Sequence, residues 1–137
     1  MEKVIFQQDI PTLRVAATSF PAGVMAAYEK LHSVLPAQEG RQTFGISHSD
    51  EQGNILYWAA TNILDEQDQE KSGFEPFTIR KGAYASVLVK DFDQDMPIIG
   101  RTFEKLLTHP ELDDSEGYCL EIYLNDHDVQ CLVKLKD

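Results

Sequence analysis

Basic residues are scarce in this 137-residue chain: 12 Lys and Arg stand against 23 Asp and Glu, which gives a formal net charge of −11. A surface of this sign repels the phosphate backbone of nucleic acids, whose binding depends on clustered Lys and Arg. Direct binding to nucleic acid is therefore not expected, and no segment has the pattern of a helix-turn-helix. The acidic excess favours solubility more than it indicates a basic partner.

Long hydrophobic runs and export signals are also missing. No apolar run approaches the roughly 18 residues of a membrane-spanning helix, and the first 15 residues lack a basic stretch followed by an apolar block and a cleavage site. The four His residues lie far apart in the sequence, without the spacing of metal ligands. We therefore expect a soluble cytoplasmic protein, a single domain over residues 1–137, with no membrane, metal or cofactor.

A short repeat organises the chain. The segment YEKL at 28–31 recurs as FEKL at 103–106, each time late in a stretch with the spacing of an amphipathic helix. One predicted strand precedes each helix, and two predicted strands joined by a polar turn follow it. The pattern predicts two strand-helix-hairpin halves, about 1–64 and 73–137, connected by the polar linker at about 65–72.

These two halves predict an α+β fold. Because neither half can bury a core alone, we expect them to be related by a pseudo-twofold axis and to join in one antiparallel sheet, with both helices on one face. The opening strands are predicted at about 13–18 and 77–89, the second of them bent near Gly82. The other face of the sheet is predicted to be open, and the order of the strands does not follow from the pattern.

Alternation along the strands assigns side chains to the two faces. Between residues 118 and 124 one alternate set is wholly aliphatic and is predicted to pack beneath the helices: Leu120, Ile122 and Leu124. The other set is then predicted to face the open side: Cys119, Glu121 and Tyr123. Cys131 belongs to the aliphatic set of the last strand, so the two cysteines are expected on opposite faces, as reduced thiols.

Aromatic and acidic side chains thereby gather on the open face. Glu121 and Tyr123 are predicted to share it with Trp58 and Tyr84, beside small residues that leave a concavity. One interpretation is a solvated sheet face, which would be expected to be polar. The other is a pocket in which aromatic rings surround one carboxylate, a site that suits a flat or lipophilic cation. We predict a ligand site made of Glu121, Tyr123, Tyr84 and Trp58.

The second half resembles the GyrI-like family, the effector-binding domains of multidrug-responsive transcription regulators, which also occur as free-standing proteins. Family members carry His or Lys followed by Gly-Pro-Tyr, and later Glu-x-Tyr-x-Asn-Asp; this chain has KGAY at 81–84 and EIYLND at 121–126. The resemblance implies a ligand groove between two modules, with Glu121 at its base and Tyr84 and Tyr123 at the tyrosine positions. Ala83 replaces the usual proline.

Three functions stay open at this point. The first is a stand-alone module that binds a lipophilic, cationic organic ligand around Glu121 and acts in a transcriptional or drug response through partners. The second is a hydrolase of strained electrophiles, which the resemblance to free-standing members implies, with Glu121 as general base and Tyr123 as its hydrogen-bond partner. The third is an inhibitor that binds a protein partner such as gyrase. Neither the natural ligand nor the oligomeric state follows from the sequence.

Overall fold

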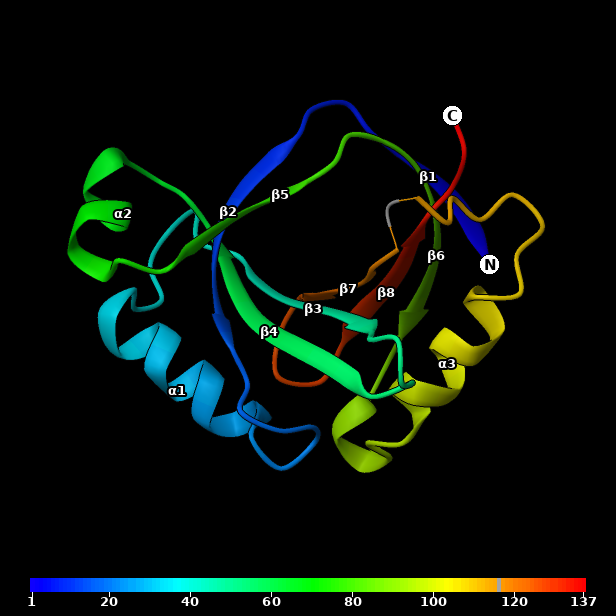
Figure 1. The fold of residues 1–137 in the computed structure, drawn as a ribbon, viewed down its shortest axis with the longest axis horizontal. Helices are drawn as coiled ribbons and strands as arrows, with labels where there is room; N and C mark the ends of the chain where they lie inside the picture. The colour runs from blue at the N-terminus through cyan, green and yellow to red at the C-terminus, as the bar shows by residue number, and fades with distance from the viewer. Residues whose placement is uncertain (116) are drawn as a thin grey trace.

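The chain forms one curled antiparallel sheet and three helices, in a computed structural model that describes residues 1–115 and 117–137 (Figure 1). The strands are β1 (Glu2–Phe6), β2 (Ile10–Ala16), β3 (Thr43–Ser49), β4 (Ile55–Asn62), β5 (Glu75–Ile79), β6 (Gly82–Val89), β7 (Cys119–Tyr123) and β8 (Val129–Lys134). The helices are α1 (Val24–Val34), α2 (Glu66–Ser72) and α3 (Ile98–Leu106), with a 3-10 turn at Phe92–Gln94 before α3.

The strand order is symmetric about its centre. It runs β1-β6-β8-β7-β3-β4-β2-β5, so β7 and β3 are the central pair. Next to β7 lies its hairpin partner β8, followed by β6, the strand that precedes α3. Next to β3 lies its hairpin partner β4, followed by β2, the strand that precedes α1. The outermost strands are exchanged between the halves, because β1 pairs with β6 and β5 pairs with β2. This exchange ties both strand-helix-hairpin modules into one sheet.

Both long helices pack on one face of the sheet, as predicted. Helix α1 packs on β2 and β4 through Ala27 and Leu31, and α3 packs on β6 and β8 through Phe103 and Leu106. The central pair β3–β7 therefore lies between the two helices (Figure 1). Within the described residues, no helix is long and apolar enough to cross a membrane.

The face away from these helices is not open, contrary to the prediction. The sheet curls around a second apolar core on that side, and both outermost strands contribute to it through Phe6 of β1 and Phe77 of β5. The largest buried side chains of this core are Phe44, Ile46, Ile79, Tyr84, Leu120 and Leu132. A sheet covered in this way carries apolar residues on both faces.

The predicted facing of strand β7 was therefore wrong. Leu120 and Ile122 point into the second core. Glu121 lies on the helix side, because it pairs directly with Cys131, whose side chain packs in the core beneath α3. Leu124 follows the end of β7 and is 53% exposed. Leu120, Ile122 and Leu124 were predicted to pack beneath the helices because only one face of the sheet was expected to be covered, whereas the curled sheet has two covered faces.

The predicted strand at 77–89 is two strands rather than one bent strand. Strand β5 ends at Ile79 and pairs with β2, and β6 begins at Gly82 and pairs with β8 and β1. Gly82 has φ 118°, a conformation that only glycine adopts readily. The chain therefore leaves one half of the sheet and enters the other at this position.

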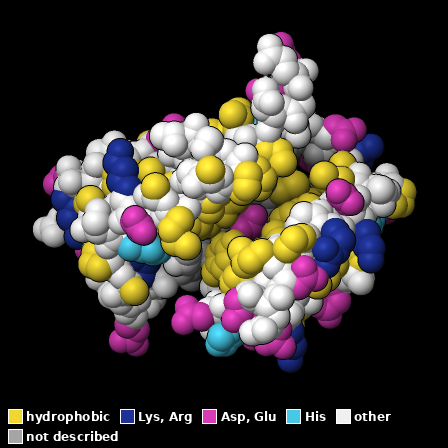
Figure 2. Space-filling model, turned by 90° about the horizontal axis from the view of Figure 1, so that it is seen from below, with side chains coloured by type: hydrophobic (Ala, Val, Ile, Leu, Met, Phe, Trp, Pro, Cys, Tyr) yellow, Lys and Arg dark blue, Asp and Glu magenta, His cyan; other side chains and the backbone are white. Residues whose placement is uncertain are grey.

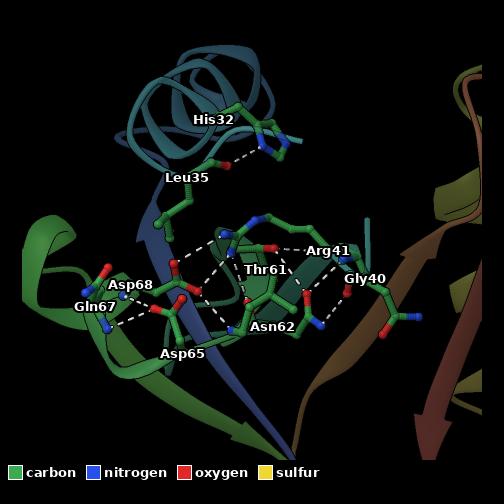
Figure 3. A network of polar contacts seen from close by, with 11 residues as sticks. His32, Leu35, Gly40, Arg41, Thr61, Asn62, Asp65, Gln67 and Asp68 are labelled. Carbon is green, nitrogen blue, oxygen red and sulfur yellow. Dashed lines mark hydrogen bonds and ion pairs between the residues drawn. The ribbon is translucent and has the colours of Figure 1, made fainter. Parts of the chain in front are cut away.

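The polar segment at 65–72, predicted as a linker, contains helix α2. Asp65 caps the helix by accepting hydrogen bonds from two backbone N–H groups of the first turn, and Gly73 ends it in the left-handed conformation. Asp68 is buried and forms an ion pair with Arg41, whose Nη1 and Nη2 lie 3.2 and 3.3 Å from its two carboxylate oxygens (Figure 3). This pair holds α2 against the segment that leads into β3.

Candidate functional site

A groove runs between α1 and α3 on the helix side of the sheet, over the central strands. Its volume is about 1510 Å³, and residues from both halves line it. Figure 2 shows this side as a hollow surrounded by hydrophobic side chains, with an acidic group at its centre. Several large apolar side chains of the lining are exposed: Phe20, Met25, Met96 and Leu107. Exposed apolar surface around a hollow is typical of a binding site.

Glu121 of β7 is the buried carboxylate of this lining. The residue is 5% exposed, and Oε1 accepts hydrogen bonds from Tyr57 Oη at 2.9 Å and Tyr123 Oη at 2.5 Å. Oε2 accepts none from the described residues and keeps some accessible surface. No Lys, Arg or His in the described part of the chain forms an ion pair with it. The protein therefore supplies hydrogen-bond donors to this acid but no cation.

This environment changes the protonation of the acid and of its partners. Burial raises the pKa of Glu121 above its ordinary value, and the hydrogen bonds from Tyr123 and Tyr57 offset only part of that rise. Burial also raises the pKa of both phenols, and the negative charge of Glu121 raises each of them further. The phenols consequently keep their protons at neutral pH and remain donors to the carboxylate.

Five aromatic rings of the groove, which we call the aromatic belt, form a connected cluster that includes the two phenols bonded to Glu121: Phe20, Tyr28, Tyr57, Phe92 and Tyr123. Tyr28 of α1 contacts both phenols, with its ring centroid 6.2 Å from Tyr57 and 6.0 Å from Tyr123. Its hydroxyl lies 2.8 Å from Tyr57 Oη. Phe20 stacks on Tyr57 at 5.7 Å, and Phe92 lies edge-on to Tyr123 at 5.6 Å. The belt therefore joins the two halves of the groove around a single carboxylate.

Gly45 of β3 provides the space that this arrangement needs. It pairs directly with Glu121 across the centre of the sheet. A Cβ at this position would lie 2.2 Å from Tyr57 Oη and 2.7 Å from Glu121 Oε1, closer than real Cβ contacts come. A side chain here would therefore displace the phenol or the carboxylate. The second half of the chain therefore provides the acid, Glu121, and the first half provides a residue without a side chain, Gly45, directly opposite it.

Trp58 and Tyr84 lie outside the groove. Trp58 pairs with Ile46 on the opposite face of the sheet and stacks with His48 at 5.2 Å between ring centroids. Tyr84 is fully buried in the second core, where its hydroxyl donates to the carbonyl of Arg80. The prediction that they share a face with Glu121 is wrong, because Glu121 lies on the helix side of the sheet, whereas Trp58 and Tyr84 face away from the helices. Tyr123 does lie beside Glu121, as predicted.

Two important residues of the site, Tyr28 and Tyr57, were not predicted, and Gly45 was expected only as one of the small residues that leave a concavity on the face of Glu121. Tyr28 had a signal in the sequence, because YEKL and FEKL differ only at this position, and the extra hydroxyl also donates to the carbonyl of Phe44 at 3.0 Å. Tyr57 was correctly assigned to the helix side, but that side was not expected to hold the groove. The role of Gly45 depends on the pairing of β3 with β7, which no local pattern gives.

The two cysteines lie on the same face as Glu121, contrary to the prediction, and both are free thiols. Burial is the main cause that raises the pKa of Cys119 to about 11 and that of Cys131 to about 12. Both thiols are therefore protonated at neutral pH and poor nucleophiles. Over residues 1–115 and 117–137, no group of three or more His, Cys, Asp or Glu side chains is arranged to hold a metal ion.

No family model matches the sequence, and no curated protein does. Solved structures share the fold. An integron cassette protein from Vibrio cholerae superimposes with a TM-score of 0.67 at 12% identity, over 99% of this chain and 100% of that chain. SAV2435, solved bound to tetraphenylphosphonium, has a TM-score of 0.64 at 10% identity, over 99% and 94%. A hydrolase from Listeria innocua has a TM-score of 0.55 at 15% identity, over 98% and 90%.

These similarities concern the fold alone. The neighbours include a protein with a bound ligand and a hydrolase, and the curled sheet with its helices is compatible with the GyrI-like fold.

Proposed function

We propose that this protein binds a lipophilic organic cation in the groove, with Glu121 as the counter-charge. One observation carries the proposal: the residue is only 5% exposed, yet none of the described Lys, Arg or His residues forms an ion pair with it. A buried charge without a partner is costly, and a cationic ligand would supply the partner that the chain does not. The unbonded Oε2 is the oxygen available to it.

The aromatic belt favours a particular kind of cation. The faces of aromatic rings attract positive charge by about 0.5–2 kcal/mol per contact, the more so when water is excluded. Met25 and Met96 add flexible apolar surface, which adapts to ligands of different shape. A strongly hydrated cation would lose its water without gaining from this surface, so the groove favours a cation whose charge is spread or shielded by apolar groups.

The ligand of one structural neighbour supports this chemistry. Tetraphenylphosphonium, which is bound to SAV2435, is a lipophilic cation of this type, and SAV2435 has the same fold. A module with such a site would act in a drug or transcriptional response through partners.

Calorimetric titration with tetraphenylphosphonium tests the proposal. Glu121→Gln is expected to weaken binding at least about thirtyfold, the lower end of the cost of removing one partner of a buried charge pair. Glu104→Gln is the matched control, because Glu104 also lines the groove but is exposed. Its loss is expected to change the affinity by less than about twofold. Equal losses in the two variants, or undiminished binding by Glu121→Gln, would refute the proposal.

A hydrolase of strained electrophiles is the second candidate, and the free oxygen of Glu121 favours it. Oε2 can accept a proton from water while the phenols hold Oε1 in place. The fold shared with the hydrolase from Listeria innocua supports this candidate. Turnover of an aryl epoxide by the wild type, lost in Glu121→Gln, is the expected result. A rate no higher than in buffer would exclude the reaction with this substrate class.

A further inference from the structure

The two phenols that contact Glu121 donate to the same oxygen. Tyr57 and Tyr123 both bond to Oε1, and no described residue bonds to Oε2. A proton placed on Oε1 would meet two hydrogens that already point at that oxygen. A carboxyl group that takes up a proton here therefore carries it on Oε2, as an O–H donor exposed to the groove.

We propose that the groove binds a second class of ligand: neutral, lipophilic molecules with a strong oxygen acceptor, such as a ketone, an amide or a phosphine oxide. The protonated carboxyl of Glu121 would donate its Oε2 hydrogen to the ligand oxygen, and the aromatic belt would cover the apolar remainder. The inference rests on the proposed function, since it uses the same groove. A ligand that excludes water from the groove leaves this donor in need of an acceptor, so the protonated site favours a ligand that supplies one.

The proton determines which class is bound. Ionised Glu121 attracts a cation and offers no donor to a neutral oxygen, whereas protonated Glu121 has a donor and no charge. Burial, which raises the pKa of this carboxyl, extends the protonated form to higher pH than an exposed glutamate would allow. A single side chain thus selects between two ligand chemistries.

The buried groups that interact electrostatically with Glu121 do not change charge over the same range. The titratable side chains that face it are Tyr28 from α1, Tyr57 from β4, Cys119 and Tyr123 from β7, and Cys131 from β8. Burial is the main cause that raises the pKa of each of them, so all five stay neutral in acidic and neutral solution. Strand β3 presents Gly45, and the charged groove residues of α3, Arg101 and Glu104, are exposed.

Two probes of similar bulk separate the classes: triphenylphosphine oxide, which is neutral with a strong acceptor, and tetraphenylphosphonium, which is a cation. As the pH rises above the pKa of Glu121, oxide binding is expected to weaken by about tenfold per pH unit. Below that pKa, phosphonium binding is expected to strengthen with pH by a similar factor. Triphenylphosphine sulfide, a much weaker acceptor, controls for apolar contact alone. Equal affinity and the same pH profile for oxide and sulfide would overturn the inference.

Glu121→Gln provides a second, independent test. Its amide oxygen can accept the two phenol hydrogen bonds, while its NH2 group takes the place of Oε2 and donates to the ligand. This variant is expected to bind the oxide within about threefold of the acidic wild type, without dependence on pH, while it loses phosphonium. Glu66→Gln, which changes an exposed acid of α2 outside the groove, is expected to behave as the wild type with both probes.

The outcomes distinguish this inference from the proposed function. Loss of oxide binding in a Glu121→Gln variant that circular dichroism shows to be folded overturns the inference, and phosphonium binding by the wild type then still stands. Oxide binding with the expected pH profile, in a wild type that does not bind phosphonium at any pH, supports the inference and refutes cation binding.

Discussion

Asp68 and Glu121 are the two buried carboxylates of the described chain, 3% and 5% exposed, and they differ in their partners. Asp68 accepts hydrogen bonds from both Nη atoms of Arg41 and from the backbone N–H of Leu64, the last at 2.9 Å (Figure 3). Among the described residues, Glu121 accepts hydrogen bonds only from two phenol hydroxyls, and both bonds are made to the same oxygen, Oε1. The first acid has its own cation and completes the packing of α2. The second lacks one and faces a groove, which leaves a place for a cation from outside.

The pKa of Asp68 lies below the ordinary value for its residue type and that of Glu121 lies above it, although burial acts to raise both. For Asp68, hydrogen bonds from Arg41 and the backbone of Leu64, together with the Arg41 charge, outweigh burial and hold the pKa below its ordinary value. For Glu121 the phenols do not outweigh burial, and the pKa lies above its ordinary value. The two acids are buried to a similar extent, so the charge of their hydrogen-bond partners distinguishes the acid that supports the fold from the acid that is available to a ligand.

These directions have opposite consequences for stability. Native Asp68 binds its proton less tightly than the unfolded chain does, so its contribution is present above the unfolded pKa and is lost as pH falls through the folded one. Native Glu121 binds its proton more tightly than the unfolded chain does. Its effect is therefore a loss of stability that develops as pH rises from the unfolded pKa to the folded one.

The largest effect is expected from Asp68→Asn. It leaves the buried guanidinium of Arg41 without a counter-charge and is expected to lower the free energy of unfolding by about 3–5 kcal/mol at pH 7. Urea denaturation measures the change, with the exposed Glu66→Gln of the same helix as a control expected to stay within about 0.5 kcal/mol. The difference between wild type and Asp68→Asn is expected to shrink in acid. A loss no larger than that of the control would contradict the structural role of this pair.

Gly45→Ala is expected to have the next largest effect. The added Cβ meets Tyr57 Oη and Glu121 Oε1, so the variant is expected to lose about 1–3 kcal/mol of stability and to bind tetraphenylphosphonium more weakly. Adding Tyr57→Phe removes the nearest of these atoms and is expected to restore part of the loss. Strict additivity of the two changes in denaturation experiments would show that Gly45 and Tyr57 do not compete for this space.

Glu121→Gln is expected to stabilise the protein, in contrast to Asp68→Asn. At pH 7 the substitution removes a carboxyl group whose ionisation is unfavourable in the folded protein, and the free energy of unfolding is expected to rise by about 1 kcal/mol. In a chain of this length such a gain raises Tm by roughly 3 °C. The gain is expected to disappear near pH 4, where the acid is largely protonated in both states. Scanning calorimetry at both pH values measures it. A lower Tm than the wild type at pH 7 would mean that Glu121 supports the fold as Asp68 does.

The smallest effect is expected from Tyr28→Phe, which makes the two helix segments identical. It removes one hydroxyl that contacts Tyr57 and the carbonyl of Phe44, and is expected to cost about 0.5 kcal/mol. Urea denaturation is the measurement. A cost larger than that of Gly45→Ala would place Tyr28, rather than the Gly45–Glu121 pair, at the centre of the site.

Helices α1 and α3 and the α+β class could be predicted because their signals are local. The apolar stripes around residues 24–35 and 99–106 set the faces of α1 and α3, which form at Val24–Val34 and Ile98–Leu106. Glu121 and Tyr123 could be predicted together, since residues two apart on a strand share a face. These parts of the prediction did not depend on how the strands are ordered.

The remaining parts depend on distant pairings that no local pattern contains. A curled sheet has two apolar faces, so the aliphatic residues Leu120 and Ile122 did not reveal which face the helices cover. Trp58 was included in the predicted site, and Tyr57 was left out, because Glu121 was assigned to the face away from the helices and lies on the other one. The match of Gly45 with Glu121 requires that β3 and β7 meet at the centre of the sheet, and strand order was not available from the sequence.

Carboxyl-carbon NMR titration tests the contrast between the two acids most directly, because Asp68 and Glu121 report in one spectrum. Without ligand, Asp68 is expected to titrate below the ordinary value for aspartate and Glu121 above that for glutamate. Saturation with tetraphenylphosphonium is expected to lower the pKa of Glu121 and to leave that of Asp68 unchanged. An ordinary pKa for Glu121, unaffected by the bound cation, would contradict its role as the counter-charge.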